Sequence, residues 1–104
     1  MGKSITYEEF AENLNTKFHA SVDGGNADGA IVVALDLAEV SELKLSPKQE
    51  QFSVVFRGPR DRFLGQGMRS LEHDKIGQAE LFLVPVREDA EGYYYEAVFN
   101  RFRK

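Results

Sequence analysis

A chain of 104 residues with 42% hydrophobic and 29% charged residues has the composition of one soluble globular domain with a modest core. Its net charge of −4 argues against nucleic acid as a general partner, because phosphate binding requires a surplus of positive charge. The absence of cysteine excludes disulfides and cysteine-based zinc sites, and a reducing cytoplasm is the expected location. No apolar run approaches the roughly 20 residues that span a bilayer, so we expect no membrane partner.

The first predicted element is a short amphipathic helix at about 7–14. Thr6 and Glu9 have the spacing of a capping box, which satisfies the free N–H groups at a helix start. Apolar residues then recur at three- and four-residue spacing as far as Leu14. Asn15 readily adopts the left-handed conformation that ends a helix.

Short segments with alternating or continuous apolar residues predict about six strands. They lie at about 17–22, 30–40, 51–57, 68–73, 79–87 and 93–102. In the second, the apolar phase slips near Ala38–Glu39, which predicts a β-bulge that bends the sheet. Leu43 and Leu45 continue this strand or cover an edge. A dense turn signal at 23–29 separates the first two strands.

The continuous apolar run Leu81–Val86 predicts a central strand that is buried on both faces. Phe82 and Leu83 would then both be buried, one in the main core and the other under the helix or a long loop. The segment 93–102 follows after a short polar turn and completes a hairpin. Pro85 is expected at an edge or a bulge, because it has no N–H to donate to a neighbouring strand.

One helix and about six short strands with short connections favour antiparallel neighbours, and no βαβ alternation suggests a parallel sheet. The predicted fold class is mainly β: a curled antiparallel sheet that forms a small barrel or sandwich, with the helix over one open end. The whole chain, 1–104, is expected to be a single domain.

Five short motifs follow one another: FSVVFRGP at 52–59, LGQG at 64–67, LEH at 71–73, LFLVPV at 81–86 and YEAVFN at 95–100. In this order they resemble a family of roughly hundred-residue bacterial proteins classed as a domain of unknown function. In that family a tyrosine often follows the LGQG-like turn, near the place where this chain has Arg69. The resemblance implies no activity. Such proteins are encoded near phage-tail-like or collar-like proteins, which implies at most an assembly or accessory role.

The residues that could carry chemistry do not form a recognisable catalytic group. His73 stands between Glu72 and Asp74, but successive side chains of a strand point to opposite faces and cannot converge on one ion. We interpret His73 as a strand-end histidine that hydrogen-bonds a carbonyl. The loop 23–29 lacks the ligand spacing of a calcium site. We therefore predict no enzyme activity, no cofactor and no metal site.

Arginines around the Gly-Pro turn and a run of tyrosines are the candidate partner-binding residues: Arg57, Arg60, Arg62, Arg69, Tyr93 and Tyr94. Alternation along a strand should expose at least one of the three tyrosine rings at 93–95. We predict a non-catalytic protein-interaction or assembly module that binds a protein partner or self-associates. The alternative is a small-ligand carrier with a cavity lined by Phe52, Phe56, Phe82 and Phe99.

Overall fold

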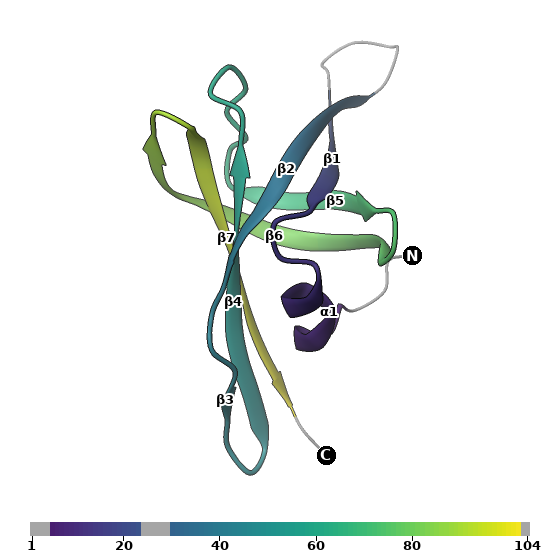
Figure 1. Ribbon diagram of the computed structural model, residues 1–104, viewed down its shortest axis with the longest axis vertical. Coiled ribbons are helices and arrows are strands. Elements are labelled where there is room, and N and C mark those ends of the chain that lie inside the picture. Colours follow the sequence, from purple (N-terminus) through teal and green to yellow (C-terminus); the bar gives the residue numbers. More distant parts are fainter. Residues whose placement is uncertain (1–4, 24–29, 103–104) are drawn as a thin grey trace.

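The computed structural model of the chain describes residues 5–23 and 30–102. These residues form one helix and seven strands (Figure 1): α1 (Tyr7–Glu12), β1 (Lys17–Asp23), β2 (Ala30–Val40), β3 (Lys44–Leu45), β4 (Gln49–Gly58), β5 (Gly67–His73), β6 (Gly77–Asp89) and β7 (Gly92–Phe102). The six predicted strands are confirmed, with ends that shift by a few residues. The very short β3 holds Leu45. Most of the predicted turn at 23–29 lies outside the described residues.

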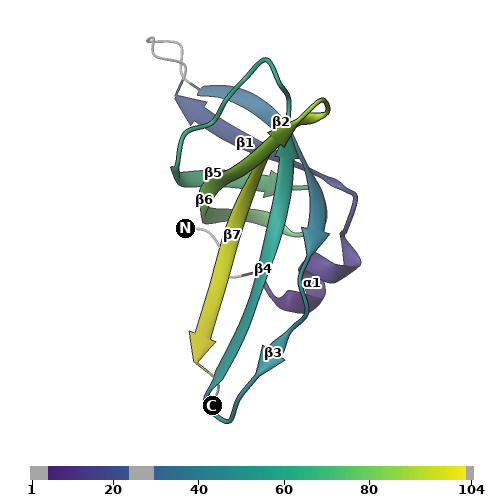
Figure 2. The ribbon, with the colours of Figure 1, turned by 90° about the vertical axis from the view of Figure 1, so that its left-hand side faces the viewer.

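All the strands belong to one antiparallel sheet in the order β2-β1-β5-β6-β7-β4-β3. An additional pairing between β2 and β4, at Asp36–Val40 and Val54–Arg57, closes the first six strands of this order into a barrel. The structure is therefore a barrel and not a sandwich. β4 and β7 continue beyond the barrel as a long two-stranded arm, and β3 extends the arm on the far side of β4 (Figures 1 and 2).

The helix begins as the sequence predicts. The Glu9 N–H donates to Thr6 Oγ1 and the Thr6 N–H donates to Glu9 Oε1, each at 3.1 Å, which completes the capping box. α1 ends at Glu12, earlier than expected, and Leu14 is exposed rather than on the buried face. Asn15 has a φ of 70°, the predicted left-handed conformation.

Two predicted irregularities of the sheet are confirmed. The register of β2 against β4 shifts between Leu37 and Glu39, where the apolar phase slips. The register of β6 against β7 shifts between Pro85 and Arg87. Pro85 also lies beyond the ladder between β5 and β6, which ends at Leu83, so β7 is its single neighbouring strand among the described residues.

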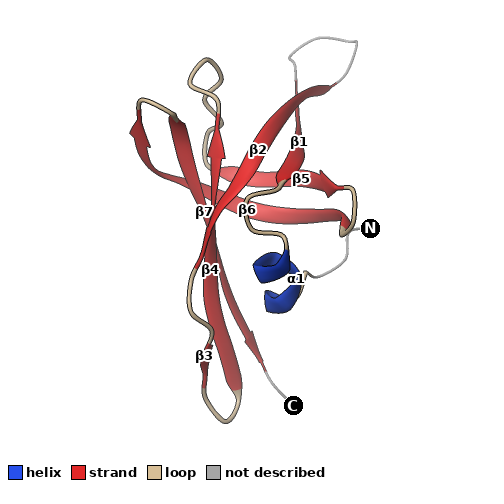
Figure 3. Cartoon of the chain, in the orientation of Figure 1, coloured by secondary structure: helices blue, strands red, loops and turns tan. Residues whose placement is uncertain are grey.

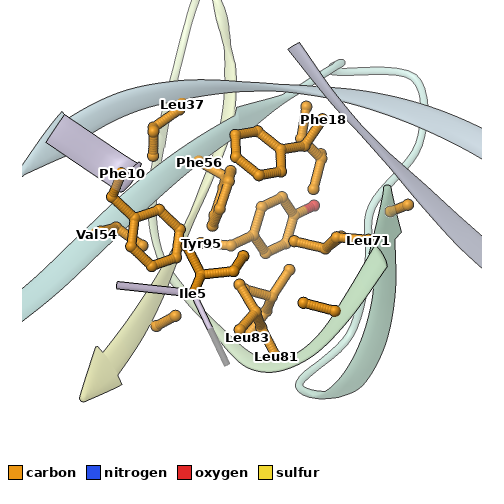
Figure 4. Close-up of a cluster of buried hydrophobic side chains, with 14 of the residues drawn as sticks. Ile5, Phe10, Phe18, Leu37, Val54, Phe56, Leu71, Leu81, Leu83 and Tyr95 are labelled. Carbon is orange, nitrogen blue, oxygen red and sulfur yellow. The ribbon is translucent and has the colours of Figure 1, made fainter. Parts of the chain in front are cut away.

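Side chains fill the interior of the barrel (Figure 4). The largest fully buried ones are Tyr95, Phe10, Phe18, Phe56, Ile5, Leu35, Leu37, Leu71, Leu83 and Val54. The buried hydroxyl of Tyr95 accepts a hydrogen bond from the Leu64 N–H at 2.8 Å, and burial raises the pKa of this phenol. Aromatic and aliphatic side chains thus make up the core of the barrel.

The prediction that Leu81–Val86 is buried on both faces is wrong. Leu83 is 0% exposed, whereas Phe82, the next residue, is 47% exposed. Among residues 5–23 and 30–102, neither the helix nor a loop buries the outer face of β6 as it does the inner one, so the strand alternates as in an ordinary antiparallel sheet with one exposed face. The apolar outer residues gave the run its continuous appearance in the sequence.

Among the described residues we distinguish two openings of the barrel. The first, which we call the helix-covered end, lies next to α1 (Figure 3), as predicted. The ring of Phe10 lies against three strands, with centroids 6.4 Å from Phe18, 6.0 Å from Phe52 and 5.4 Å from Phe99. The second, which we call the β2–β4 gap, opens where the ladder between β2 and β4 ends at Asp36 and Arg57.

Candidate functional site

A groove of about 430 Å³ follows the β2–β4 gap. We call it the β2-edge groove, and it is lined by Lys17, Ile31, Val32, Val33, Ala34, Asp36, Arg57, Gly58, Pro59, Asp61, Arg62 and Glu91. Four consecutive residues of one strand, Ile31–Ala34, belong to this lining. One face of a strand contributes only alternate residues. The groove therefore runs along the edge of β2, where backbone N–H and C=O groups point.

The sequence of β4 explains why this edge is open. Pro59 follows Gly58, and a proline has no N–H with which to continue a ladder. The chain turns away at this point, and β2 pairs with β4 only from Asp36 onward. Within the described residues, Ile31–Leu35 have a ladder partner on the β1 side alone.

Four charged side chains form a chain of ion pairs across the groove. Lys17 Nζ lies 2.8 Å from Asp36 Oδ1, Arg57 Nη2 lies 3.0 Å from Asp36 Oδ2, and Arg57 Nη1 lies 3.2 Å from Glu91 Oε1. The hydrogen bond from Lys17 is the main cause that lowers the pKa of Asp36, with Arg57 adding to it against the opposing effect of burial. Each of the four charged side chains thus has an oppositely charged partner within the chain. The ion pairs join β1, β2, β4 and the turn before β7.

Two of the predicted arginines, Arg57 and Arg62, line the β2-edge groove. Arg62 is exposed, and it forms no ion pair with the described part of the chain. Arg69 lies elsewhere, on β5, where its Nη2 donates to the Gly65 carbonyl at 2.7 Å. The sequence analysis placed all the candidate arginines around the Gly-Pro turn, whereas only some of them lie together there. Their positions depend on the path of the loop 59–66, which the sequence does not reveal.

Arg60 and Tyr93 belong to a separate surface cluster. Arg60 donates to the Asp89 carbonyl and lies 3.6 Å from Glu88 Oε2, and its guanidinium lies 5.9 Å from the centroid of the Tyr93 ring. The ring of Phe63 meets Tyr93 edge-on at 5.0 Å. Partners within the chain thus engage both predicted residues.

The tyrosine run is less exposed than the sequence suggested. Tyr93 is half-buried, Tyr94 is only 6% exposed and Tyr95 belongs to the core. Tyr94 points outward, but the guanidinium of Arg87 covers its ring at 4.2 Å and its hydroxyl donates to Asp89 Oδ2 at 2.9 Å. That hydrogen bond raises the pKa of Tyr94. Long polar side chains of the hairpin bury this ring, which alternation alone could not reveal.

The outer face of β5 and β6 carries a feature that the sequence analysis did not single out. Met68 of β5 lies directly opposite Phe82 of β6, and these side chains are 58% and 47% exposed. We call them the Met68–Phe82 pair. The sequence analysis predicted that Phe82 is buried, so it did not reveal that Phe82 and Met68 share an exposed face.

The four phenylalanines of the predicted ligand cavity do not all lie together. Phe52 and Phe56 belong to the core and Phe99 packs against it, whereas Phe82 is on the outer surface. Phe52 and Phe99 do border a groove of about 440 Å³ that involves β4 and β7 of the arm. This groove lies outside the barrel and also includes polar residues, among them Gln51, Ser53 and Asn100.

His73 is buried and acts as a structural hydrogen-bonding centre. Its Nδ1 accepts from the backbone N–H groups of Lys75 at 3.0 Å and Ile76 at 3.3 Å. The Thr16 hydroxyl donates to the Asn13 carbonyl, so its oxygen accepts from His73 Nε2–H at 2.9 Å. The expected carbonyl partner is therefore replaced by a hydroxyl and two amides. Burial lowers the pKa of this imidazole, and no group of three or more potential metal ligands occurs among residues 5–23 and 30–102.

A family model described as "Domain of unknown function (DUF6916)" matches residues 5–99. Neither a curated protein nor a solved structure matches the chain. In the part of the chain that the structure describes, no helix is long and apolar enough to cross a membrane.

Proposed function

Because the chain belongs to the family described as "Domain of unknown function (DUF6916)", whose description names no activity, we propose a function from its own surface. The protein is a non-catalytic interaction or assembly module, and its docking surface is the outer face of β5 and β6. The Met68–Phe82 pair is the observation that supports this proposal.

The pair has the properties of an interface anchor. Aromatic residues and methionine are enriched in interfaces, and well-packed aromatic side chains commonly dominate their energy. Phe82 stands in the middle of an apolar strand, next to Leu83, which is 0% exposed. β6 therefore presents one face to the core and the other to solvent, where a partner can bury it.

The expected energy sets the scale of the effect. Full burial of a large apolar side chain contributes roughly 1.5–3 kcal/mol. Because about half of each side chain is exposed, a partner that covers both would gain roughly 2 kcal/mol from them, or more than tenfold in affinity. A specific interface buries about 800 Å² on each partner, so neighbouring residues such as Ser70, Glu80 and Val84 would form its rim.

The family resemblance supplies a setting for this proposal. A bacterial cytoplasmic protein that accompanies phage-tail-like assemblies would need a docking surface rather than an active site. The carrier alternative has less support, because aromatic and aliphatic side chains fill the barrel interior and the described grooves lie outside it.

Site-specific photo-crosslinking in the producing cell tests the proposal. A photoreactive phenylalanine analogue replaces Phe82, and a matched control carries it at Leu45, an exposed apolar residue of the arm. We expect a discrete adduct from position 82, of twice the chain mass for self-association or of another defined mass for a partner. Met68→Asp in the same chain should abolish it. No adduct at position 82, or the same adducts from both positions, would contradict the proposal.

A further inference from the structure

Within residues 5–23 and 30–102, the free edge of β2 lacks the features that keep strand edges from pairing with other chains. Natural edges carry charged residues, prolines or bulges, or are covered by another element. Ile31–Leu35 reads Ile-Val-Val-Ala-Leu, with no charge and no proline, and the bulge of β2 comes later, between Leu37 and Glu39. This edge is therefore a template for one more strand.

The β2-edge groove has the shape that an added strand requires. The edge of Ile31–Ala34 forms one side, and Gly58, Pro59, Asp61 and Arg62 belong to the same lining. Strand residues advance about 3.3 Å each, so the four edge residues offer roughly 13 Å of pairing length. A segment of four or five extended residues would pair with β2 in the position that β4 no longer occupies beyond Pro59.

The charges of the groove indicate what such a segment should carry. Lys17, Asp36, Arg57 and Glu91 already satisfy one another. Arg62 and Asp61 are the two charged residues of the lining that have no ion-pair partner among residues 5–23 and 30–102. Arg62 is therefore available to a carboxylate of the occupant, and Asp61 to a cation or a polar group beside it. Arg–carboxylate pairs are favourable in both charge and geometry.

We propose that the β2-edge groove binds an extended segment of a partner polypeptide, which adds to β2 as a strand and places an acidic side chain at Arg62. Main-chain hydrogen bonds to a free edge supply affinity in this mode of recognition, and side-chain contacts supply specificity. The site is distinct from the outer face of β5 and β6 and does not depend on it. Nucleic acid does not fit the groove, because three cations, Lys17, Arg57 and Arg62, are balanced by three anions in the lining.

The first test uses a display library of random linear heptapeptides, selected against the full-length protein. Enriched peptides should combine β-branched residues with one Asp or Glu, and they should shift the backbone amide resonances of Ile31–Ala34. Arg62→Ala should weaken the affinity for these peptides about two- to fivefold, as expected for an exposed ion pair. Arg60→Ala, a neighbouring arginine outside the groove lining, should leave their affinity unchanged.

The second test separates edge pairing from side-chain docking. Two versions of the best peptide carry N-methyl groups on alternate residues, in the two possible phases. Only one phase removes the N–H groups that face β2, so one version should lose binding by tenfold or more and the other should retain it.

Three results would overturn the proposal: no enrichment, equal binding of both N-methylated versions, or resonance shifts that map away from Ile31–Ala34. Resonance shifts confined to Met68 and Phe82 would overturn the edge-pairing proposal but would leave the proposed function in place.

Discussion

The two openings of the barrel wall show two different ways of ending a sheet. At the helix-covered end, Phe10 packs against the rings of Phe18, Phe52 and Phe99, and the opening becomes part of the core. At the β2–β4 gap, charged side chains pair across the opening and a strand edge stays free. The difference indicates that the first opening serves stability and the second remains available for binding.

Truncating one side chain at each opening should give the largest contrast. Phe10→Ala should lower the free energy of unfolding by about 3–5 kcal/mol, because the ring is fully buried and a cavity would remain. Val32→Ala, on the exposed side of the free edge, should change it by about 0.5 kcal/mol or less. Urea denaturation of both variants measures the difference. Similar losses would mean that the two openings are equally structural.

The rim of the β2–β4 gap should be sensitive to a single methyl group. A Cβ at Gly92 would lie 2.0 Å from the Gly58 carbonyl oxygen, and φ at Gly92 is +157°. Gly92→Ala should therefore cost about 1–3 kcal/mol of stability, because two backbone segments must separate. Gly65→Ala is the matched control, since its nearest contact would be Arg69 Nη2 at 4.0 Å. If thermal unfolding shows equal effects for the two variants, Gly58 and Gly92 do not approach this closely.

The turn between β5 and β6 should make stability depend on pH near neutrality. His73 accepts two N–H groups at Nδ1, so protonating it in the folded state breaks both bonds, and burial lowers its folded pKa below the ordinary 6.5. Well above pH 6.5 the imidazole is neutral in both states and does not affect stability. As the pH falls through 6.5 the unfolded state gains a proton first, so stability falls until the folded pKa is reached.

The slope from this one group is at most about 1.4 kcal/mol per pH unit. Denaturation of the wild type across pH 5–7.5 should show it. His73→Asn keeps an acceptor for the backbone and should flatten the curve. A slope that survives His73→Asn would assign the effect to other groups, Asp74 and Lys75 being the nearest charges on the same turn.

The smallest expected effect belongs to the ion pairs at the gap. Arg57→Gln should cost about 0.2–1 kcal/mol at low salt, the usual range for partly exposed pairs. The difference from the wild type should shrink in molar sodium chloride, because salt screens such charges. The loss caused by Phe10→Ala should persist in the same salt. A salt-independent loss for Arg57→Gln would mean that packing, not charge, holds this side of the barrel.

Local chemistry explains which features could be predicted from the sequence. Features that depend only on residues close in sequence were predicted correctly. They are the capping box of Thr6 and Glu9, the conformation of Asn15, the bulge near Ala38–Glu39 and the position of Pro85. The closure of the barrel depends on the long-range pairing of β2 with β4, which periodicity does not encode. That pairing also decides where the ladder between β2 and β4 ends, so the sequence alone could not predict the β2-edge groove.

The errors have a common physical cause. A continuous apolar run and a tyrosine run were judged by residue type, whereas burial depends on what covers each outer face. Phe82 is 47% exposed, whereas the guanidinium of Arg87 covers the ring of Tyr94. Arg57 and Arg62 were named correctly as neighbours of the Gly-Pro turn, but their shared groove depends on Pro59 ending the ladder.

Chemical denaturation of Phe82→Ala and Leu83→Ala tests the central claim most directly, because these neighbours differ mainly in which face of β6 they occupy. Leu83→Ala should lower the free energy of unfolding by about 2–5 kcal/mol through lost burial and a residual cavity. Phe82→Ala should lower it by less than about 1 kcal/mol, since its ring lies on a face that a partner, not the core, is proposed to cover. Equal large losses from the two variants would show that both faces of β6 are structural and would contradict the account.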